Sequence, residues 1–484
     1  MTTQSESQQP QREGVLAGLD SQVTTSFYWY LAVLSCIGGF LFGYDTADIG
    51  SVLSFIPYHL STFATGYLVA GASIGAAVGA LGAGPLTDRF GRKSLLIADA
   101  GIYAVGALLS AFAVNAAILL AARTLIGLAV GADSAIATAY IAEFAPQKKR
   151  GALMIMQQWM ITVGILASYI VAVVTFKVAP GSAGGVDWRI ILGLGAVPAL
   201  IALGLRTNMP ESPRWLMAHG RYADTQKALE QLGMEVTEDQ VRETAEELDA
   251  TERALEKKTL WTPGVKRALW IVCIFFVFQQ ISGINIPFYY GPQLLGSYFQ
   301  SGKSAVDAAV AGVEASTILA IVNVIATFFA FRYIDKIGRR KLAIGGYAGM
   351  AVFILVAALG VAQLSGLPRV WVIMVGFSFF ITSFAIGVGG TGWLIQGEVF
   401  PTAVRGRAAA TAASVDWLAN FVIVQWFPTL NKHWGLAWVM VLFAVLAVMA
   451  IGFVAKYLPE TKGLPLEEVT ALFDRQARGE AAPG

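Results

Sequence analysis

The chain has 484 residues, of which 56% are hydrophobic and 14% charged, and its mean hydropathy is +0.61. Soluble domains contain about 25% charged residues, so this composition excludes a soluble globular protein and indicates a membrane protein. The formal net charge is +2 and no dense basic patch is present, which gives no reason to expect a nucleic-acid partner.

Apolar segments long enough to cross ~30 Å of hydrocarbon recur along the chain. They predict twelve membrane helices, at residues 27–53, 62–87, 94–113, 117–143, 151–178, 188–206, 267–299, 306–334, 341–364, 369–398, 404–430 and 434–458. We therefore expect an all-α membrane protein made of two six-helix halves. The expected parts are a disordered tail, a six-helix bundle, a linker with short amphipathic helices, a second bundle and a second tail, at residues 1–26, 27–206, 207–266, 267–458 and 459–484.

The basic residues predict the orientation, because cytoplasmic loops have an excess of Lys and Arg. With both termini in the cytoplasm, five basic residues fall on the outer side: Lys177, Arg189, Lys303, Arg369 and Lys432. Arg123 falls inside the membrane, and all the others of the 34 Lys and Arg residues fall on the cytoplasmic side. The prediction is a multi-pass protein of the cell membrane with both ends inside.

The second half of the chain repeats short patterns of the first half in the same order. The pairs are residues 88–93 with 335–340, Glu143 with Glu398, Arg150-Gly151 with Arg405-Gly406, and Pro210-Glu211 with Pro459-Glu460. Parallel six-helix repeats are a known transporter architecture, with the substrate site near the membrane midplane between the halves.

Acids and bases of this repeat gather at the cytoplasmic helix ends: Arg92, Glu143, Arg150 and Glu211 in one half, and Arg339, Glu398, Arg405 and Glu460 in the other. We interpret them as a cytoplasmic gate, a set of salt bridges that holds the inner side closed. The alternative is topogenic charge with a loop-forming role, but the acids repeat as well as the bases.

The first apolar segment contains two carboxylates, Asp45 and Asp48. Residues three apart share a helix face, so both should point into the same protein interior. Arg123 stands alone among apolar residues of the fourth segment and needs an anion inside the membrane. In the second segment, Gly71, Gly75 and Gly79 are spaced by four, which predicts close helix packing.

The seventh segment contains three amide side chains, Gln279, Gln280 and Asn285. Amides offer donors and acceptors together, which suits hydroxyl groups of a substrate. A regular helix would spread them around its surface, but Ser282-Gly283 and Pro287 allow it to break and bring them together. The alternative is hydrogen bonding between helices, at ~0.6 kcal/mol for each bond.

Several motifs, in order, resemble those of the major facilitator superfamily and, within it, the sugar porter family. They are the two loop motifs at residues 88–93 and 335–340, Gly39-Phe40-Leu41-Phe42-Gly43-Tyr44-Asp45, Pro210-Glu211-Ser212-Pro213-Arg214-Trp215-Leu216, Gln279-Gln280-Ile281-Ser282-Gly283-Ile284-Asn285, Tyr289-Tyr290 and Pro459-Glu460-Thr461-Lys462-Gly463. The resemblance extends over nearly all of residues 27–463.

The resemblance implies roles for individual residues. Asp45 would be the protonation site, Arg123 its partner, and Tyr289 and Tyr290 the outer gate. The residues expected to bind substrate are Gln158, Gln279, Gln280, Asn285, Asn323, Trp393, Asp416, Trp417 and Asn420. Gly389-Gly390-Thr391-Gly392 would unwind the tenth helix beside the site.

The chain departs from the family pattern in a surplus of acids, at Asp48, Asp99, Asp133, Glu314 and Asp416. These acids would either bind a cation or an amine-bearing substrate, or add hydroxyl acceptors and proton sites for a sugar. For Asp99 and Glu314 the simpler interpretation is exposure near a helix end.

The function that we predict is proton-coupled symport of a sugar or polyol by alternating access. The alternatives are a proton-coupled transporter of another small polar metabolite, cationic ones included, a facilitative sugar uniporter, and a nutrient sensor with the same fold. We expect a monomer in the lipid bilayer and no enzyme, because His59, His219 and His433 lie away from the span centres and no nucleophile–base pair emerges. Cys36 and Cys273 suggest no disulfide or metal site, and no cofactor is expected.

Overall fold

The computed structural model describes residues 26–144, 150–178, 183–246, 261–299, 304–400 and 402–462, with a few further positions between 469 and 478. For residues 26, 142, 144, 150–155, 183–184, 331–336 and 402–403 it gives the backbone alone. Within this described part of the chain every regular element is helical. The predicted all-α fold class is confirmed.

Twelve helical segments of the described residues are long and apolar enough to cross a membrane. In the first half they are α2 (Ser26–Val52), α3 (Thr62–Phe90), α4 (Arg92–Ala111), α5 (Ala116–Phe144), α6 (Arg150–Val178) and the pair α7 (Trp188–Leu194) and α8 (Ala196–Arg206), which follows a π-helical turn at Ala183–Asp187. In the second half they are α12 (Pro263–Ile281) with α13 (Ile286–Tyr289), α15 (Ala305–Ile337), α16 (Arg339–Gln363), α17 (Gly366–Phe384) with α18 (Gly390–Val399), α19 (Thr402–Trp434) and α20 (Leu436–Tyr457).

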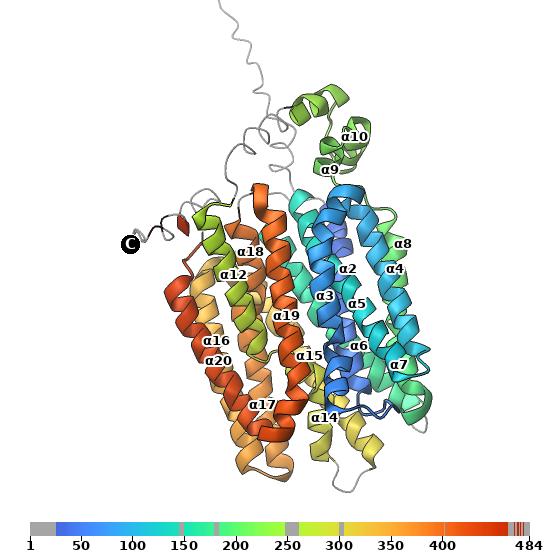
Figure 1. Ribbon diagram of the computed structural model, residues 1–484, viewed down its shortest axis with the longest axis vertical. Helices are drawn as coiled ribbons and strands as arrows, with labels where there is room; N and C mark the ends of the chain where they lie inside the picture. Colours follow the sequence, from blue (N-terminus) through green and yellow to red (C-terminus); the bar gives the residue numbers. More distant parts are fainter. Residues whose placement is uncertain are drawn as a thin grey trace, which may run out of the picture.

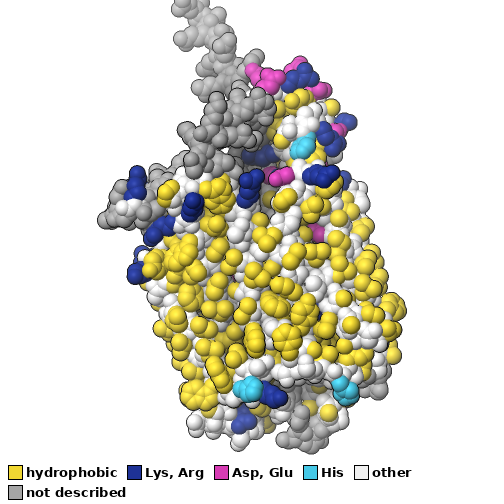
Figure 2. Space-filling view, viewed as in Figure 1, with side chains coloured by type: hydrophobic (Ala, Val, Ile, Leu, Met, Phe, Trp, Pro, Cys, Tyr) yellow, Lys and Arg dark blue, Asp and Glu magenta, His cyan; other side chains and the backbone are white. Residues whose placement is uncertain are grey.

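The helices form two bundles side by side, α2–α8 and α12–α20 (Figure 1). Two short helices between them in the sequence, α9 (Pro213–Ala218) and α10 (Tyr222–Gln231), cap one end of the first bundle, which we call the linker end. Hydrophobic side chains cover the middle of the molecule, while Lys, Arg, Asp and Glu gather at the linker end (Figure 2). This surface suits a bilayer that surrounds the bundles and leaves both ends in water.

The segment predicted as one helix at residues 267–299 is broken. α12 ends at Ile281, Gly283 has a φ of +84°, and two short helices follow, α13 and α14 (Gly291–Gly296), before a 3₁₀ turn at Ser297–Phe299. A proline stands in the first turn of α13 and of α14, where its missing N–H costs no hydrogen bond. The break predicted at Ser282-Gly283 is confirmed, and it places Asn285 at the start of α13.

The tenth segment differs from the expectation. Residues 389–392 are not unwound; instead a π-helical turn at Ala385–Gly389 joins α17 to α18, which is regular from Gly390. The backbones of α16 and this turn touch here, because a Cβ on Gly387 would lie 2.5 Å from the Leu342 carbonyl oxygen. The glycines at this position allow close packing and a widened turn, and neither requires the helix to open.

The glycine repeat of α3 packs against α5, as predicted. A Cβ on Gly75 would lie 2.1 Å from the Thr124 carbonyl oxygen, and one on Gly79 equally close to that of Leu128. In return, a Cβ on Gly127 of α5 would lie 1.8 Å from the Ala72 carbonyl oxygen of α3. This backbone contact fixes the position of Arg123, which lies on α5 one turn before Gly127.

Candidate functional site

Asp45 of α2 and Arg123 of α5 form a buried ion pair, as predicted. Arg123 Nη2 donates to Asp45 Oδ2 at 2.9 Å, Nη1 contacts Oδ1, and Nε donates to the Leu68 carbonyl oxygen at 3.2 Å. The arginine is fully buried and the aspartate is 1% exposed. A bidentate pair of this kind holds both planar groups in one orientation.

Asp48 faces the same guanidinium. Its Oδ1 lies 3.9 Å from Arg123 Nη1, and this buried oxygen accepts no hydrogen bond from the described residues. Two carboxyl groups therefore share one arginine, so the group carries a surplus negative charge when both acids are ionised. A buried surplus charge is costly, which favours a proton on one of the acids.

Four of the predicted substrate residues form a second buried polar group, the amide cluster of Gln280, Asn285, Asp416 and Asn420. Gln280 Nε2 donates to Asp416 Oδ1 at 2.8 Å, and Asn285 Nδ2 donates to Gln280 Oε1 at 2.9 Å and to Asn420 Oδ1 at 3.0 Å. Asn420 Nδ2 donates to Ser73 Oγ of α3 at 3.0 Å. The cluster thus joins α12, α13 and α19 to the first bundle.

Three further predicted residues lie among aromatic rings or close to them. Trp393 of α18 packs on Phe276 with 5.2 Å between ring centroids, and Trp417 of α19 packs edge-on against Phe42 at 4.8 Å. Gln279 is buried, and its Oε1 has no hydrogen-bond partner among the described residues. A buried amide oxygen without a donor is free to accept a hydrogen bond from a bound molecule.

Gln158 and Asn323 stand apart from the amide cluster. Asn323 of α15 is buried and accepts a hydrogen bond from Thr327 at 3.4 Å, while Gln158 of α6 is half-buried. Within the described part of the chain, no hydrogen bond joins either side chain to the cluster. Their predicted contact with substrate stays a prediction.

Tyr289 connects the ion pair to the amide cluster. Thr46, the neighbour of Asp45, donates to the Tyr289 hydroxyl at 3.5 Å, and this hydroxyl also hydrogen-bonds Asn420. Tyr290 donates to the Val424 carbonyl oxygen at 3.0 Å. Tyr289 thus links α2, the helix that carries Asp45, to the amide cluster of the second bundle.

The two bundles meet closely at the end away from the linker, which we call the opposite end. Tyr169 of α6 donates to the Phe288 carbonyl oxygen of α13 at 2.5 Å. A Cβ on Gly50 of α2 would lie 2.6 Å from the same carbonyl oxygen, and Gln425 of α19 donates to the Phe63 carbonyl oxygen of α3 at 2.9 Å. These contacts close the molecule at the opposite end.

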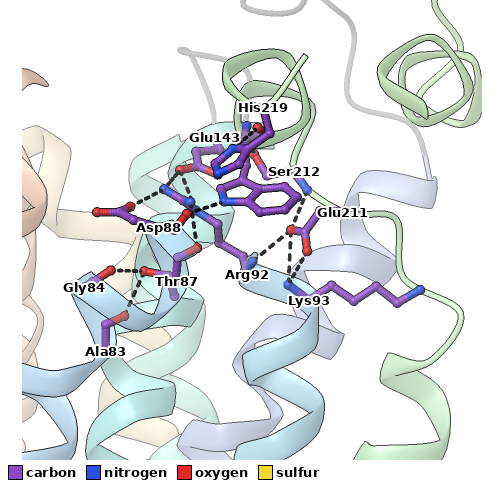
Figure 3. A network of polar contacts seen from close by, with 11 residues as sticks. Ala83, Gly84, Thr87, Asp88, Arg92, Lys93, Glu143, Glu211, Ser212 and His219 are labelled. Atoms are coloured by element: carbon purple, nitrogen blue, oxygen red, sulfur yellow. Dashed lines mark hydrogen bonds and ion pairs between the residues drawn. The ribbon is translucent and has the colours of Figure 1, made fainter. Parts of the chain in front are cut away.

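The linker end contains the first predicted gate cluster (Figure 3). Arg92 Nη2 lies 3.1 Å from Glu143 Oε1 and 3.5 Å from Asp88 Oδ1. Glu211 accepts the backbone N–H groups of Arg92 at 2.9 Å and of Lys93 at 3.2 Å, so its carboxylate caps the start of α4. Burial raises the pKa of Glu143, and the Arg92 guanidinium opposes that rise.

The second half repeats this geometry. Arg339 Nη2 lies 2.7 Å from Glu398 Oε1, and Glu460 accepts the backbone N–H groups of Arg339 at 2.9 Å and of Arg340 at 3.2 Å. Arg405 Nε donates to the Phe400 carbonyl oxygen at 3.1 Å. The side chain of Arg150 lies outside the described residues.

Arg206 and Asp99 differ from the expectations. Arg206 was assigned to the cytoplasmic side with the other basic residues and Asp99 to an exposed helix end, but both are buried and form an ion pair that also includes Asp133. Arg206 lies at the end of a span, where the positive-inside rule already explains a basic residue. The sequence therefore did not indicate that Arg206 is the partner of Asp99 and Asp133. Glu314, by contrast, is 44% exposed and lies 2.7 Å from Lys177.

Comparison with known proteins identifies the family. The model of the family described as "Sugar (and other) transporter" matches residues 31–473. The chain belongs to this family. It is 35% identical to the glucose transporter GlcP of Staphylococcus epidermidis over 91% of this chain and 96% of the relative. It is 33% identical to the arabinose-proton symporter of Bacillus subtilis, over 92% and 95%.

Solved structures of this family have the same fold. A partially occluded inward-open structure of the xylose transporter XylE from E. coli superimposes with a TM-score of 0.77 at 27% identity, covering 91% of this chain and all of that chain. A structure of the proton:xylose symporter XylE bound to 6-bromo-6-deoxy-D-glucose superimposes with a TM-score of 0.76 at 28% identity, covering 93% of this chain and 99% of that chain. The predicted superfamily and sugar porter family are confirmed, and the family is one of multi-pass membrane transporters.

Proposed function

We propose that this member of the sugar transporter family moves a sugar or polyol together with protons by alternating access. One observation supports the proposal above all others: Tyr289 links α2, which carries the buried Asp45–Arg123 pair, to a cluster of amides. The first group is suited to bind a proton and the second to bind hydroxyls. Relatives named as an arabinose-proton symporter and a proton:xylose symporter agree with it.

In the mechanism that we propose, a proton on Asp45 neutralises the acid and weakens its hold on Arg123. Substrate hydroxyls bind to Gln280, Asn285 and Asn420, replacing some of the hydrogen bonds that these amides make with one another. With Asp48 ionised, this proton takes the group around Arg123 from a net charge of −1 to zero. The loaded carrier then has less buried charge to move, so the two bundles rock and expose the site on the other side.

The proposal includes the orientation. The linker end faces the cytoplasm, both termini lie there, and the protein works as a monomer in the cell membrane. The Lys and Arg residues that gather at the linker end in Figure 2 support this orientation. The gate pairs Arg92–Glu143 and Arg339–Glu398 each lie within one half, so we propose that these pairs hold each half rigid while the halves move.

Uptake into proteoliposomes with an imposed pH gradient tests proton coupling. Asp45→Asn keeps the shape of the side chain, but its amide does not bind and release a proton as a carboxyl group does. Accumulation of substrate against a gradient should therefore be lost while substrate exchange continues. Asp224→Asn, at an exposed residue of α10, is the matched control and should accumulate substrate normally. Uphill uptake by Asp45→Asn would contradict the proposal and favour proton coupling through another residue. Wild-type transport that does not respond to the pH gradient would favour a uniporter.

Asp416 supports a second candidate, transport of an amine-bearing substrate. It is a buried carboxylate inside the amide cluster, where it accepts a hydrogen bond from Gln280. An ammonium group would supply the positive charge that a buried carboxylate needs. Competition by glucosamine and by glucose, measured in wild type and in Asp416→Asn, separates the candidates. If glucosamine competes better than glucose in wild type and Asp416→Asn loses that preference, the substrate is cationic. If the two sugars compete equally in wild type and in the variant, the substrate is a neutral sugar.

A further inference from the structure

The first bundle contains a second buried arginine between two acids, which we call the Arg206 cluster. Arg206, the last residue of α8, donates from Nη1 to Asp99 Oδ1 of α4 at 2.7 Å and from Nη2 to Asp133 Oδ2 of α5 at 2.6 Å. It also donates to the carbonyl oxygens of Leu96 at 2.6 Å and Leu34 at 3.3 Å. Arg206 is fully buried, and Asp99 and Asp133 are 4% and 3% exposed.

The charges of this cluster do not balance. Two ionised carboxylates and one guanidinium leave a net charge of −1 in a buried position, where an uncompensated ion costs several kcal/mol. The other oxygens, Asp99 Oδ2 and Asp133 Oδ1, are buried and accept no hydrogen bond from the described residues. Both carboxyl groups contact the same guanidinium, so one proton placed on either of them would bring the cluster to neutrality.

Among the residues that the structure describes, Arg206 is the base that contacts Asp99 and Asp133. Cys36 of α2 is the further titratable side chain that interacts electrostatically with Asp133 and Arg206, and a thiol is neutral here. The backbone of α2 closes the site tightly, because a Cβ on Gly38 would lie 1.7 Å from Asp133 Oδ1. Contacts this tight leave little room for a hydrated cation, whereas a proton needs no added volume.

We propose that the Arg206 cluster is a second proton-binding site, in which Asp99 and Asp133 share one proton. It stands apart from the group around Arg123, although α5 contributes to both: Arg123 and Asp133 are ten residues apart, or ~15 Å along the helix. The Arg206 cluster lies toward the linker end, where α8 ends. The inference does not depend on which substrate is moved or on coupling through Asp45.

Infrared spectroscopy of the purified protein without substrate tests the proposal, because a protonated carboxylic acid has a C=O stretching band that a carboxylate lacks. Wild type should show this band at neutral pH. Either Asp99→Asn or Asp133→Asn should remove the part of this band that comes from the Arg206 cluster, since the acid that remains pairs with Arg206 and ionises. Asp48→Asn and Asp224→Asn should keep that component.

Thermal stability provides a second readout. A shared proton is lost as pH rises, so wild-type stability should fall toward alkaline pH, and each Asn variant should flatten this dependence because it replaces the protonated acid by a neutral isostere. An infrared component unchanged in both Asn variants would overturn the proposal. So would stabilisation by Na⁺ but not by choline in wild type, since a bound cation would then balance the charge.

Failure of sugar transport in vesicles would overturn the proposed function but not this inference, because neither readout uses substrate. Conversely, a band without the component that Asp99→Asn or Asp133→Asn removes would exclude the second proton site and leave coupling through Asp45 intact. If one Asn variant fails to fold, the other still decides the outcome, since each removes a different carboxyl group of the same pair.

Discussion

At the residue scale, Gln280 occupies the centre of the amide cluster. It donates to Asp416 and accepts from Asn285, so both ends of its side chain are engaged on two different helices. A side chain with this double role both holds its neighbours in place and presents them to a ligand. Its removal should affect binding more than the removal of a peripheral amide.

We expect Gln280→Ala to weaken substrate binding by at least tenfold, because unpaired buried polar partners cost about 1–3 kcal/mol. Equilibrium binding of the transported sugar to purified protein measures the change. Gln226→Ala, at an exposed glutamine of α10, is the control and should bind like wild type. An unchanged affinity in Gln280→Ala would place the substrate elsewhere.

Glu211→Gln should destabilise the protein by roughly 0.5–2 kcal/mol, because the carboxylate caps the N-terminus of α4 and an amide carries no charge to complement the helix dipole. Glu460→Gln should destabilise the protein by a similar amount, because Glu460 caps the start of α16 in the same way. Thermal melting in detergent measures both. Glu230→Gln on the exposed face of α10 is the matched control, and equal melting of all three variants would contradict the capping role.

The sequence predicted a buried partner only for a charged residue whose position has no other explanation. Arg123 stands alone in an apolar span, so the cost of a bare charge in lipid predicted a buried anion, and the resemblance to sugar porters indicated Asp45 as that anion. Arg206 ends a span, where a base has an ordinary topogenic reason, so its pairing with Asp99 needed the fold. Asp48 was noticed, but only the structure shows it sharing Arg123.

At the element scale, glycine decides how helices approach and where they break. The repeat in α3 brings its backbone onto α5, and Gly283 breaks the seventh span with a positive φ. Both were predicted from spacing. The π-helical turn at Ala385–Gly389 was not, because a glycine run is compatible with unwinding and with tight packing, and the choice depends on the facing backbone of α16.

Gly75→Val should therefore destabilise the first bundle by about 1–3 kcal/mol, the usual cost of overpacking, because its side chain would meet the Thr124 carbonyl. Gly84→Val, in the same helix but with open space around it, should have a much smaller effect. Melting temperature and the yield of monodisperse protein measure the difference. Similar losses in both variants would mean that helix propensity, and not the crossing, is responsible.

At the scale of the whole molecule, the two halves are joined most firmly at the opposite end and along α3 and α19. Ser414 donates to the Ala77 carbonyl oxygen at 3.0 Å, in line with the bonds of Asn420 and Gln425 to the same helix. The ion pairs Arg92–Glu143 and Arg339–Glu398 of the gate clusters, in contrast, each join residues of one half. Opening at the opposite end must break bonds such as that of Tyr169.

Tyr169→Phe should raise the population open at the opposite end by about fivefold, since it removes one hydrogen bond between the halves worth ~1 kcal/mol. The labelling rate of a thiol introduced by Ser51→Cys, in a background without the native cysteines, reports this opening. Tyr67→Phe is the control, because it removes a hydroxyl bonded to Thr124 within one half. Equal labelling in both variants would show that the Tyr169 bond does not hold the closure.

The contact between Gly38 and Asp133 restricts the order in which this protein can evolve. No side chain fits at position 38 while a carboxylate occupies position 133 in this geometry, since even a methyl group would overlap the acid. An ancestor could therefore gain the acid only after glycine was present, and a descendant can replace the glycine only with or after loss of the acid. The two positions, 95 residues apart, are therefore coupled, because the acid at one requires glycine at the other.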